Sequence, residues 1–194
     1  TGLVGTKMLE VLAERNFPVS ELIPVASERS VGKTINWKGK EIKVVGLEEA
    51  VSLKPQFALF SAGGTTSKEW APKFASKGTY VIDNSSAWRM EPNIPLVVPE
   101  VNSHHLAKDS RIIANPMFST IQMVVALKPI HDDAKIKRIV ISTYQAVSGT
   151  GQKAIKELES QVSQLFNGRD VETEAYPHQI AFNCLPHIDV FFEN

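Results

Sequence analysis

The chain has 194 residues, of which 43% are hydrophobic, enough for one large domain or for one domain with part of another. Lys and Arg number 21, as do Asp and Glu, so the formal net charge is zero and favours neither nucleic acid nor an anionic membrane. The expected partners are small molecules and further copies of the chain. Cys184 is the single cysteine, which excludes an internal disulfide. With no recognisable signal peptide or long apolar run, the chain is expected to be cytoplasmic.

The first element expected is an amphipathic helix over residues 4–16. Its apolar residues recur at helical spacing, and they are Val4, Met8, Val11 and Leu12. Residues 22–27 and 41–45 are expected to form short strands. The almost wholly apolar run at 57–64 is typical of a strand buried in a parallel sheet.

A second helix is expected over residues 67–77. Thr66 and Glu69 have the spacing of a capping box, and Gly78 stands where a helix-terminating glycine belongs. Two further apolar strands follow, at 79–86 and 111–115. Strands that alternate with helices and end in Gly, Ser or Asn predict a doubly wound α/β sheet. Ligands of such a sheet bind at the carboxyl ends of the strands.

The chain changes character near residues 118–120, where we place a domain boundary. After it we expect a helix to about Leu127, a long strand over 135–147, a further helix, and strand material over 178–194. The second of these helices carries one apolar stripe, formed by Ala154, Leu158, Val162 and Leu165.

Gly2 and Gly5 open the first helix like the second half of a glycine-rich phosphate loop. A simple glycine turn at a helix start explains them equally well. Further on, Arg29 and Ser30 follow the second expected strand, where a cation and a hydroxyl suit the 2′-phosphate of NADP. Glu28 argues against this, and an ordinary charged loop remains the alternative.

Polar and glycine residues follow two of the buried strands. Ser61, Gly63 and Asn84 could line a cofactor crevice or simply form turns. Arg89, shortly after Asn84, could grip a phosphate or carboxylate with two hydrogen bonds, although a surface arginine is the commoner case.

No metal site is expected, because the histidines do not have metal-ligand spacing. They are His104, His105, His131, His178 and His187. Cys184 lies in an apolar segment, where a small buried hydrophobic residue is the expectation rather than a nucleophile.

Several stretches, in order along nearly the whole chain, together resemble the aspartate-β-semialdehyde dehydrogenase family. They are TGLVG, SERSVGK, FSAGG, DNSSAWRM, PLVVPEVN, IANP followed by STIQMVVALKP, and STYQAVSGTGQKA. The resemblance implies an α/β fold with an N-terminal Rossmann-like NADP-binding domain over residues 1–118, its first strand missing. Residues 119–194 would form the N-terminal part of an α+β catalytic and dimerisation domain. The segment carrying the family's acid/base histidine and substrate-binding arginine would lie beyond residue 194.

The resemblance also implies a cytoplasmic homo-oligomer of lysine, threonine and methionine biosynthesis. With NADPH, such enzymes reduce aspartyl phosphate to aspartate 4-semialdehyde and release phosphate. A cysteine thiolate first displaces the phosphate, and hydride then reduces the resulting thioester.

Site roles carry over by position. The cofactor's phosphates would meet Thr1, Gly2, Leu3 and Val4, its 2′-phosphate Arg29 and Ser30, and its nicotinamide half Ser148 and Gly149. Arg89 would bind the substrate phosphate, Gln145 would orient the acyl group, and Asn115 would belong to the substrate site.

The chain departs from the family at its reaction centre. The family's motif is Asn-Pro-Asn-Cys-Ser-Thr, whereas residues 115–120 read Asn-Pro-Met-Phe-Ser-Thr. Phe118 therefore occupies the place of the nucleophilic cysteine, and Met117 that of an asparagine. A phenyl ring cannot attack an acyl phosphate, and neither Ser119 nor Cys184 is an expected substitute.

Three interpretations remain open. The chain is part of an aspartate-semialdehyde dehydrogenase, inactive with Phe118 in place of the thiol. Alternatively it is a non-catalytic, NADP-binding or dimerising relative in which Met117 and Phe118 fill the space of the reaction centre. The third is N-acetylglutamyl-phosphate reductase, which shares the chemistry, although the STYQAVSGTG stretch favours the aspartate enzyme.

Overall fold

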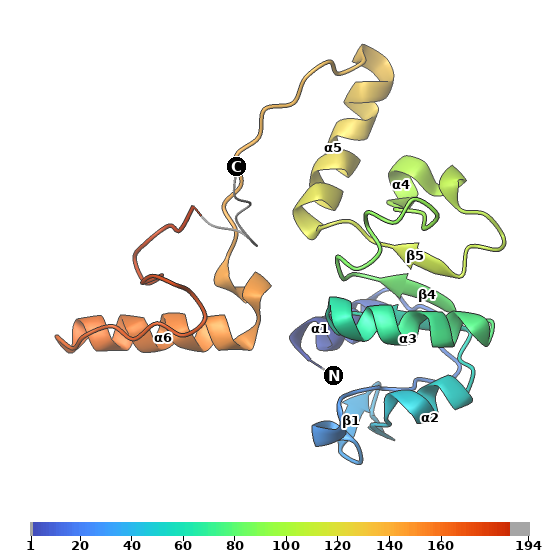
Figure 1. Ribbon diagram of the computed structural model, residues 1–194, viewed down its shortest axis with the longest axis horizontal. Coiled ribbons are helices and arrows are strands. Elements are labelled where there is room, and N and C mark those ends of the chain that lie inside the picture. The colour runs from blue at the N-terminus through green and yellow to red at the C-terminus, as the bar shows by residue number, and fades with distance from the viewer. Residues whose placement is uncertain (1, 187–194) are drawn as a thin grey trace. The chain divides into compact units, whose positions relative to one another are not determined.

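The computed structural model describes residues 2–186, which form two compact units. The first unit ends at Val140, and the second begins at Ile141. The elements of the first unit are α1 (Leu3–Glu14), η1 (Glu28–Ser30), β1 (Thr34–Trp37), β2 (Lys40–Lys43), α2 (Leu47–Ser52), β3 (Phe57–Phe60), α3 (Gly64–Ser76), β4 (Tyr80–Asp83), α4 (Pro99–Asn102), η2 (Ser103–His105), β5 (Ile112–Ala114) and α5 (Phe118–Ala134). The second unit holds η3 (Val147–Thr150) and α6 (Gln152–Phe166) (Figure 1). The domain boundary expected at 118–120 falls at the start of α5 and stays a prediction.

The first unit is built on a parallel sheet in the order β3-β4-β5, with α3 lying along it (Figure 1). Phe60 and Val81 from the strands pack with Ala71 and Phe74 of α3 and with Ala50 of α2. The rings of Phe60 and Phe74 meet edge to face at 5.5 Å between centroids. This core confirms the α/β fold predicted from the apolar runs.

The outermost strand, β3, is only partly buried. Phe60 is in the core, whereas Phe57 and Leu59 are about half exposed. Among residues 2–186 no strand pairs with the outer edge of β3, so its backbone groups on that edge have no strand partner. The run forms a strand of a parallel sheet as expected, but the expectation that it is buried was wrong for Phe57 and Leu59.

Helix α3 differs from its prediction at its start. It begins at Gly64 after the N-cap Gly63, whose φ of +84° lets the chain turn directly from β3 into the helix. Thr66 therefore lies inside the helix, and no side chain caps it, so the predicted capping box was wrong. Gly78, with φ +91°, follows the end of the helix as predicted.

The segments predicted as strands before β3 also differ. Residues 22–27 contribute only one isolated bridge, from Val25 to Val45. Strand β2 instead pairs antiparallel with β1. The tight turn between them is formed by Lys38 and Gly39, both at positive φ, a hairpin that the sequence analysis missed.

Residues 135–147 do not form the predicted strand. Most of their apolar side chains are exposed, with Val140 at 79% and Tyr144 at 88%. A strand needs a hydrogen-bonded neighbour, and the described residues offer none to this segment. Within residues 178–186 there is no strand either, and the remainder of that prediction, including His187, lies outside the described residues.

In the second unit, α6 is confirmed, but polar residues share its buried face. Ala154 is buried as expected, together with Glu157 and Gln161, whereas Leu158 is half-buried. The Gln161 amide oxygen accepts hydrogen bonds from the backbone N–H groups of Ile180 and Ala181. The Glu157 carboxylate accepts backbone N–H groups at Glu174 and Ala175. These contacts hold residues 172–181 against the helix.

Within residues 2–186, no helix is long and apolar enough to cross a bilayer.

Candidate functional site

The candidate site lies where β4 and β5 end side by side. Asp83 is paired with Ala114 in the parallel register, so the residues that follow, Asn84 and Asn115, are neighbours. Nδ2 of Asn115 donates to Oδ1 of Asn84 at 2.6 Å, and Nδ2 of Asn84 donates to the carbonyl of Phe60 at 3.2 Å. The carboxyl ends of all three strands are thereby joined into one polar surface.

Arg89 closes this surface from the loop that follows β4. Its Nε donates to the Asn115 carbonyl at 3.0 Å, and its Nη2 donates to the Asn84 carbonyl at 2.8 Å. These partners are neutral carbonyl oxygens, and no ion pair within residues 2–186 neutralises the guanidinium. The structure thus brings Asn84, Arg89 and Asn115 together, with an uncompensated positive charge suited to an anion.

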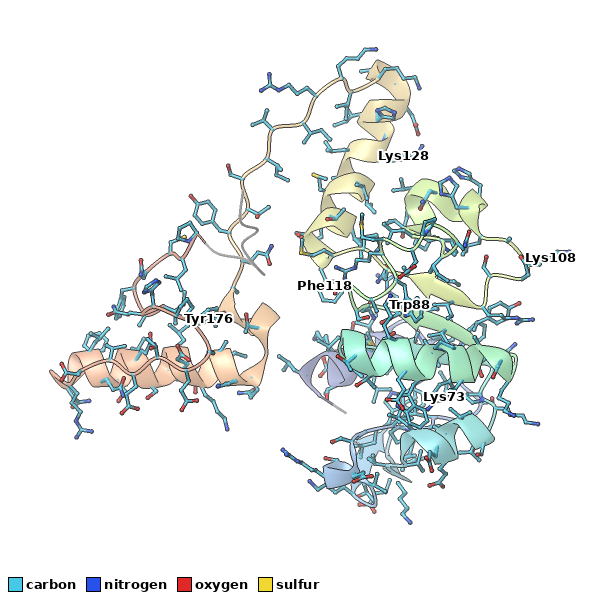
Figure 2. All side chains as sticks on the ribbon, viewed as in Figure 1. Lys73, Trp88, Lys108, Phe118, Lys128 and Tyr176 are labelled. Atoms are coloured by element: carbon cyan, nitrogen blue, oxygen red, sulfur yellow. The ribbon has the colours of Figure 1, made fainter. Side chains whose placement is uncertain are left out.

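Phe118 is the first residue of α5, and Met117 is its N-cap (Figure 2). Position 118 therefore stands at the positive end of a 17-residue helix, where a thiolate would be stabilised. The Phe118 side chain is 52% exposed and that of Met117 is 42% exposed, so neither is enclosed by the described residues.

Glycines mark the two helix starts proposed for the cofactor. Gly2 is the N-cap of α1, and a Cβ added at Gly2 or Gly5 would meet no heavy atom within 4 Å, so this helix terminus is open to a ligand. Leu3 is exposed and Val4 half-buried at the same end, while Thr1 lies outside the described residues. Gly63 and the exposed Ser61 follow the carboxyl end of β3. The first unit fits a dinucleotide at these positions.

Arg29 and Ser30 lie in η1, which follows the bridge between Val25 and Val45. Arg29 is exposed and Ser30 half-buried. Among residues 2–186 no hydrogen bond or ion pair engages the Arg29 guanidinium, so its donors are available to a ligand.

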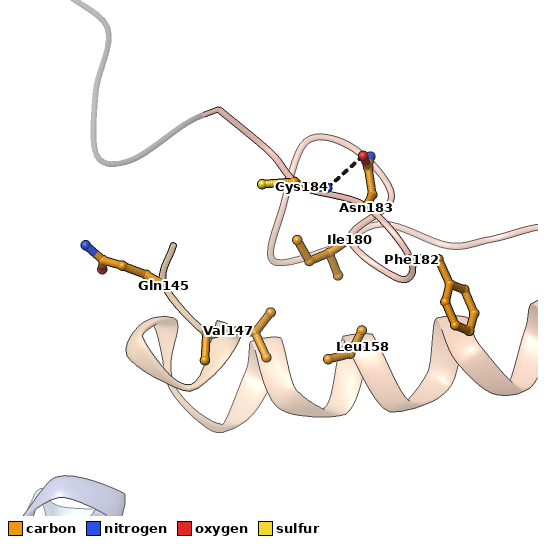
Figure 3. Close-up of a pocket in the computed structure, with 8 residues that line it drawn as sticks. Gln145, Val147, Leu158, Ile180, Phe182, Asn183 and Cys184 are labelled. Carbon is orange, nitrogen blue, oxygen red and sulfur yellow. Dashed lines mark hydrogen bonds between the residues drawn. The ribbon is translucent and has the colours of Figure 1, made fainter. Parts of the chain in front are cut away.

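In the second unit, Gln145 lines a pocket of about 610 Å³ (Figure 3). Gln145 shortly precedes η3, the turn that contains Ser148 and Gly149. The pocket lies between the start of α6 and the segment held on that helix, and Leu158 and Ile180 form part of its wall. Cys184 lines the same pocket and is exposed, which corrects the expectation of a buried core cysteine. The segment around it is a loop, so no sheet covers the thiol.

In the described part of the chain, no group of three or more His, Cys, Asp or Glu side chains is placed to hold a metal.

Asp83, a residue not selected from the sequence, is fully buried directly beneath the site. Its position as the last residue of an apolar strand, just before a polar loop, was the available signal.

A parallel sheet with polar residues gathered at the carboxyl ends of its strands is the arrangement of an α/β domain that binds ligands at that end. Comparison with family models agrees: the semialdehyde dehydrogenase NAD binding domain matches residues 1–109, and the semialdehyde dehydrogenase dimerisation domain matches residues 127–194. The chain belongs to the semialdehyde dehydrogenase family, whose members are oxidoreductases, and its relatives are aspartate-semialdehyde dehydrogenases.

Individual relatives bear this out. The aspartate-semialdehyde dehydrogenase of Aquifex aeolicus is 62% identical over 198 residues, a match that covers all of this chain and 58% of the relative. That of Legionella pneumophila is 56% identical, with 100% and 56% covered. The crystal structure of aspartate semialdehyde dehydrogenase II from Vibrio cholerae superposes with a TM-score of 0.94 at 54% identity, covering 99% of this chain and 58% of that one. The chain thus spans somewhat more than half the length of these relatives.

Proposed function

We propose that this chain is part of an NADP-dependent aspartate-semialdehyde dehydrogenase. The enzyme would reduce aspartyl phosphate to aspartate 4-semialdehyde and phosphate, in the cytoplasm, on the route to lysine, threonine and methionine. The observation that carries the proposal is the joining of Asn84, Arg89 and Asn115 just before the start of α5. The match to a dimerisation domain supports a homo-oligomer.

The polar surface suits an acyl phosphate. Arg89 is fixed by two carbonyl oxygens and keeps further N–H groups to grip phosphate oxygens. Asn115 would hold the substrate beside position 118. Gln145, exposed in its pocket, would orient the acyl group.

The cofactor proposal depends on the open N-terminus of α1 and on Arg29. Backbone amides at Gly2, Leu3 and Val4 would bind the pyrophosphate, and Arg29 and Ser30 would bind the 2′-phosphate. The remaining cofactor contacts are assigned to Thr1, Ser61, Gly63, Asn84, Ser148 and Gly149. When bound, NADPH supplies the hydride that reduces the acyl group.

Phe118 bears on whether this chain can carry out the covalent step of the reaction. A phenyl ring offers no electron pair to displace phosphate, so the covalent step has no nucleophile at that position. Ser119 is a far weaker nucleophile, and no described hydrogen bond gives it a base. We therefore propose that the chain as it stands binds its ligands without forming a thioester.

The same substitution favours a second candidate function, a non-catalytic NADP-binding and dimerising relative. Both candidates predict cofactor binding, and they differ in whether the rest of the site remains competent. N-acetylglutamyl-phosphate reductase is disfavoured as a third candidate because the named relatives act, by their names, on aspartate semialdehyde.

A chimaera separates these candidates. Residues 1–194 would be joined to the N-terminal and C-terminal parts of the Aquifex aeolicus relative that lie outside the match, so that the first strand is supplied, with and without the paired change Met117→Asn and Phe118→Cys. Our proposal predicts phosphate-dependent reduction of NADP by aspartate semialdehyde in the changed chimaera alone. Met117→Asn without the thiol is the matched control and should stay inactive. A changed chimaera that binds NADPH but remains inert would favour the non-catalytic relative.

A further inference from the structure

A buried carboxylate lies directly beneath the candidate site. Asp83, the last residue of β4, has no exposed surface. Its Oδ1 accepts the backbone N–H of Ser85 at 2.8 Å, and its Oδ2 accepts the Ser85 hydroxyl at 2.8 Å. Oδ2 also accepts a short hydrogen bond from the hydroxyl of Ser67, a fully buried residue of α3.

The network extends to the other end of the loop. Nε1 of Trp88 donates to the Ser67 hydroxyl at 2.8 Å, and the backbone N–H of Ala87 donates to the Ser85 hydroxyl at 3.2 Å. Asp83 is therefore connected to both ends of the loop 84–88, directly through Ser85 and indirectly through Ser67 and Trp88. Figure 2 labels Trp88, the residue that immediately precedes Arg89.

Stability alone is a weak reason for this arrangement. No ion pair described within residues 2–186 involves Asp83, so its carboxylate is balanced only by neutral donors. Burying a carboxylate is costly, and well-packed apolar residues often serve stability equally well. A satisfied polar network does, however, fix one geometry for the groups it joins.

The groups fixed in this way are those of the site. Asn84 is the first residue of the loop, Arg89 follows its last residue, and both form hydrogen bonds with Asn115. We propose that Asp83 is a positioning residue, which holds loop 84–88 so that Arg89 presents its guanidinium to a phosphate group. This inference rests on the proposed function in one respect, the role of Arg89 as the phosphate site.

The test compares two losses of a buried hydrogen bond at opposite ends of β4. Asp83→Asn alters the network, because both carboxylate oxygens accept hydrogen bonds and the amide puts an NH2 group, which cannot accept one, in place of one of them. Thr79→Val is the matched control: Thr79 is 1% exposed just before β4, and its hydroxyl donates to the Pro55 carbonyl at 2.7 Å. Inorganic phosphate is titrated into the unmodified chain and each variant by calorimetry, with Arg89→Ala as the reference for loss of the site.

Our proposal predicts about tenfold weaker phosphate binding in Asp83→Asn, the effect of one lost charge-assisted hydrogen bond. Thr79→Val should bind within about twofold of the unmodified chain, although it loses comparable stability. Unchanged binding in Asp83→Asn, or equal weakening in both variants, would overturn the positioning role.

Amide hydrogen exchange of residues 84–89 gives a readout that does not depend on the proposed function. Exchange in this loop should accelerate in Asp83→Asn and not in Thr79→Val. If phosphate does not bind the unmodified chain, or binds Arg89→Ala equally well, Arg89 is not the phosphate site and the proposed function loses its anion site. The exchange comparison still decides whether Asp83 fixes the loop. Should Asp83→Asn not fold, Ser67→Ala removes the hydroxyl that connects Asp83 to Trp88 and must also accelerate exchange, or the proposal fails.

Discussion

Asn115 donates a 2.6 Å hydrogen bond from its side chain to the side chain of Asn84, joining the ends of two neighbouring parallel strands. Arg89 donates to the backbone carbonyls of the same two residues. A residue assigned to the cofactor and two assigned to the substrate therefore form a single hydrogen-bonded group. Hydride transfer requires cofactor and substrate to meet at such a place.

The two carbonyl contacts of Arg89 predict that lysine cannot replace it. A lysine ammonium lacks the planar fork that reaches both carbonyls while facing a ligand. Arg89→Lys should weaken inorganic phosphate binding about tenfold, measured by calorimetry, with the fold retained by circular dichroism. Arg111→Lys is the control, because Arg111 donates to the Gly78 carbonyl at the amino ends of β4 and β5, away from the candidate site. Equal weakening in both variants would show that the loss does not depend on the carbonyl contacts of Arg89.

The exposed Arg29 predicts a preference for NADPH over NADH. Arg29→Ala should weaken NADPH binding about tenfold and leave NADH binding unchanged, because only NADPH carries the 2′-phosphate. Fluorescence titration of each cofactor measures this, and Glu28→Gln serves as a neighbouring charge control that should not reduce NADPH affinity. A variant that loses both cofactors equally would refute the assignment of the 2′-phosphate to Arg29.

The buried Gln161 predicts that the segment 172–184 depends on α6. Gln161→Leu removes the acceptor of the Ile180 and Ala181 amides, which should lower the free energy of unfolding by about 2–3 kcal/mol. The rate of alkylation of Cys184, the single cysteine, should rise as the segment loosens. Gln152→Leu, at an exposed position on the same helix, should change neither quantity. Unaltered Cys184 labelling in Gln161→Leu would show that other contacts hold the segment.

The spacing of apolar and polar residues along the sequence predicted the helices and strands whose formation depends on neighbouring residues in the chain. The apolar runs ending in polar residues located β3, β4 and β5, and the rule that parallel strands end at one edge predicted that residues such as Asn84 line a site. Helical spacing located α1 and α6 to within a few residues.

The predictions that were wrong concern residues whose secondary structure or burial depends on tertiary contacts. The alternating composition of residues 135–147 favours a strand, but a strand forms only against a partner, which the described residues lack. Gln161 is polar yet fully buried, because the backbone of residues 180–181 needs an acceptor. Asp83 was overlooked for the same reason, since its importance depends on Ser67, which only the packing of α3 brings near.

Our central proposal is that position 118 is the place of the nucleophile in an otherwise competent site. Its most direct test is peptide mass spectrometry of the changed chimaera, Met117→Asn with Phe118→Cys, after incubation with aspartate semialdehyde and NADP without phosphate. The introduced thiol would add to the aldehyde carbon, NADP would accept the hydride of that adduct, and the resulting acyl group would stay on the thiol as a thioester, because no phosphate is present to release it. We predict an aspartyl adduct on the peptide spanning residues 111–128. An adduct confined to Cys184, or no adduct despite bound NADP, would contradict the claim.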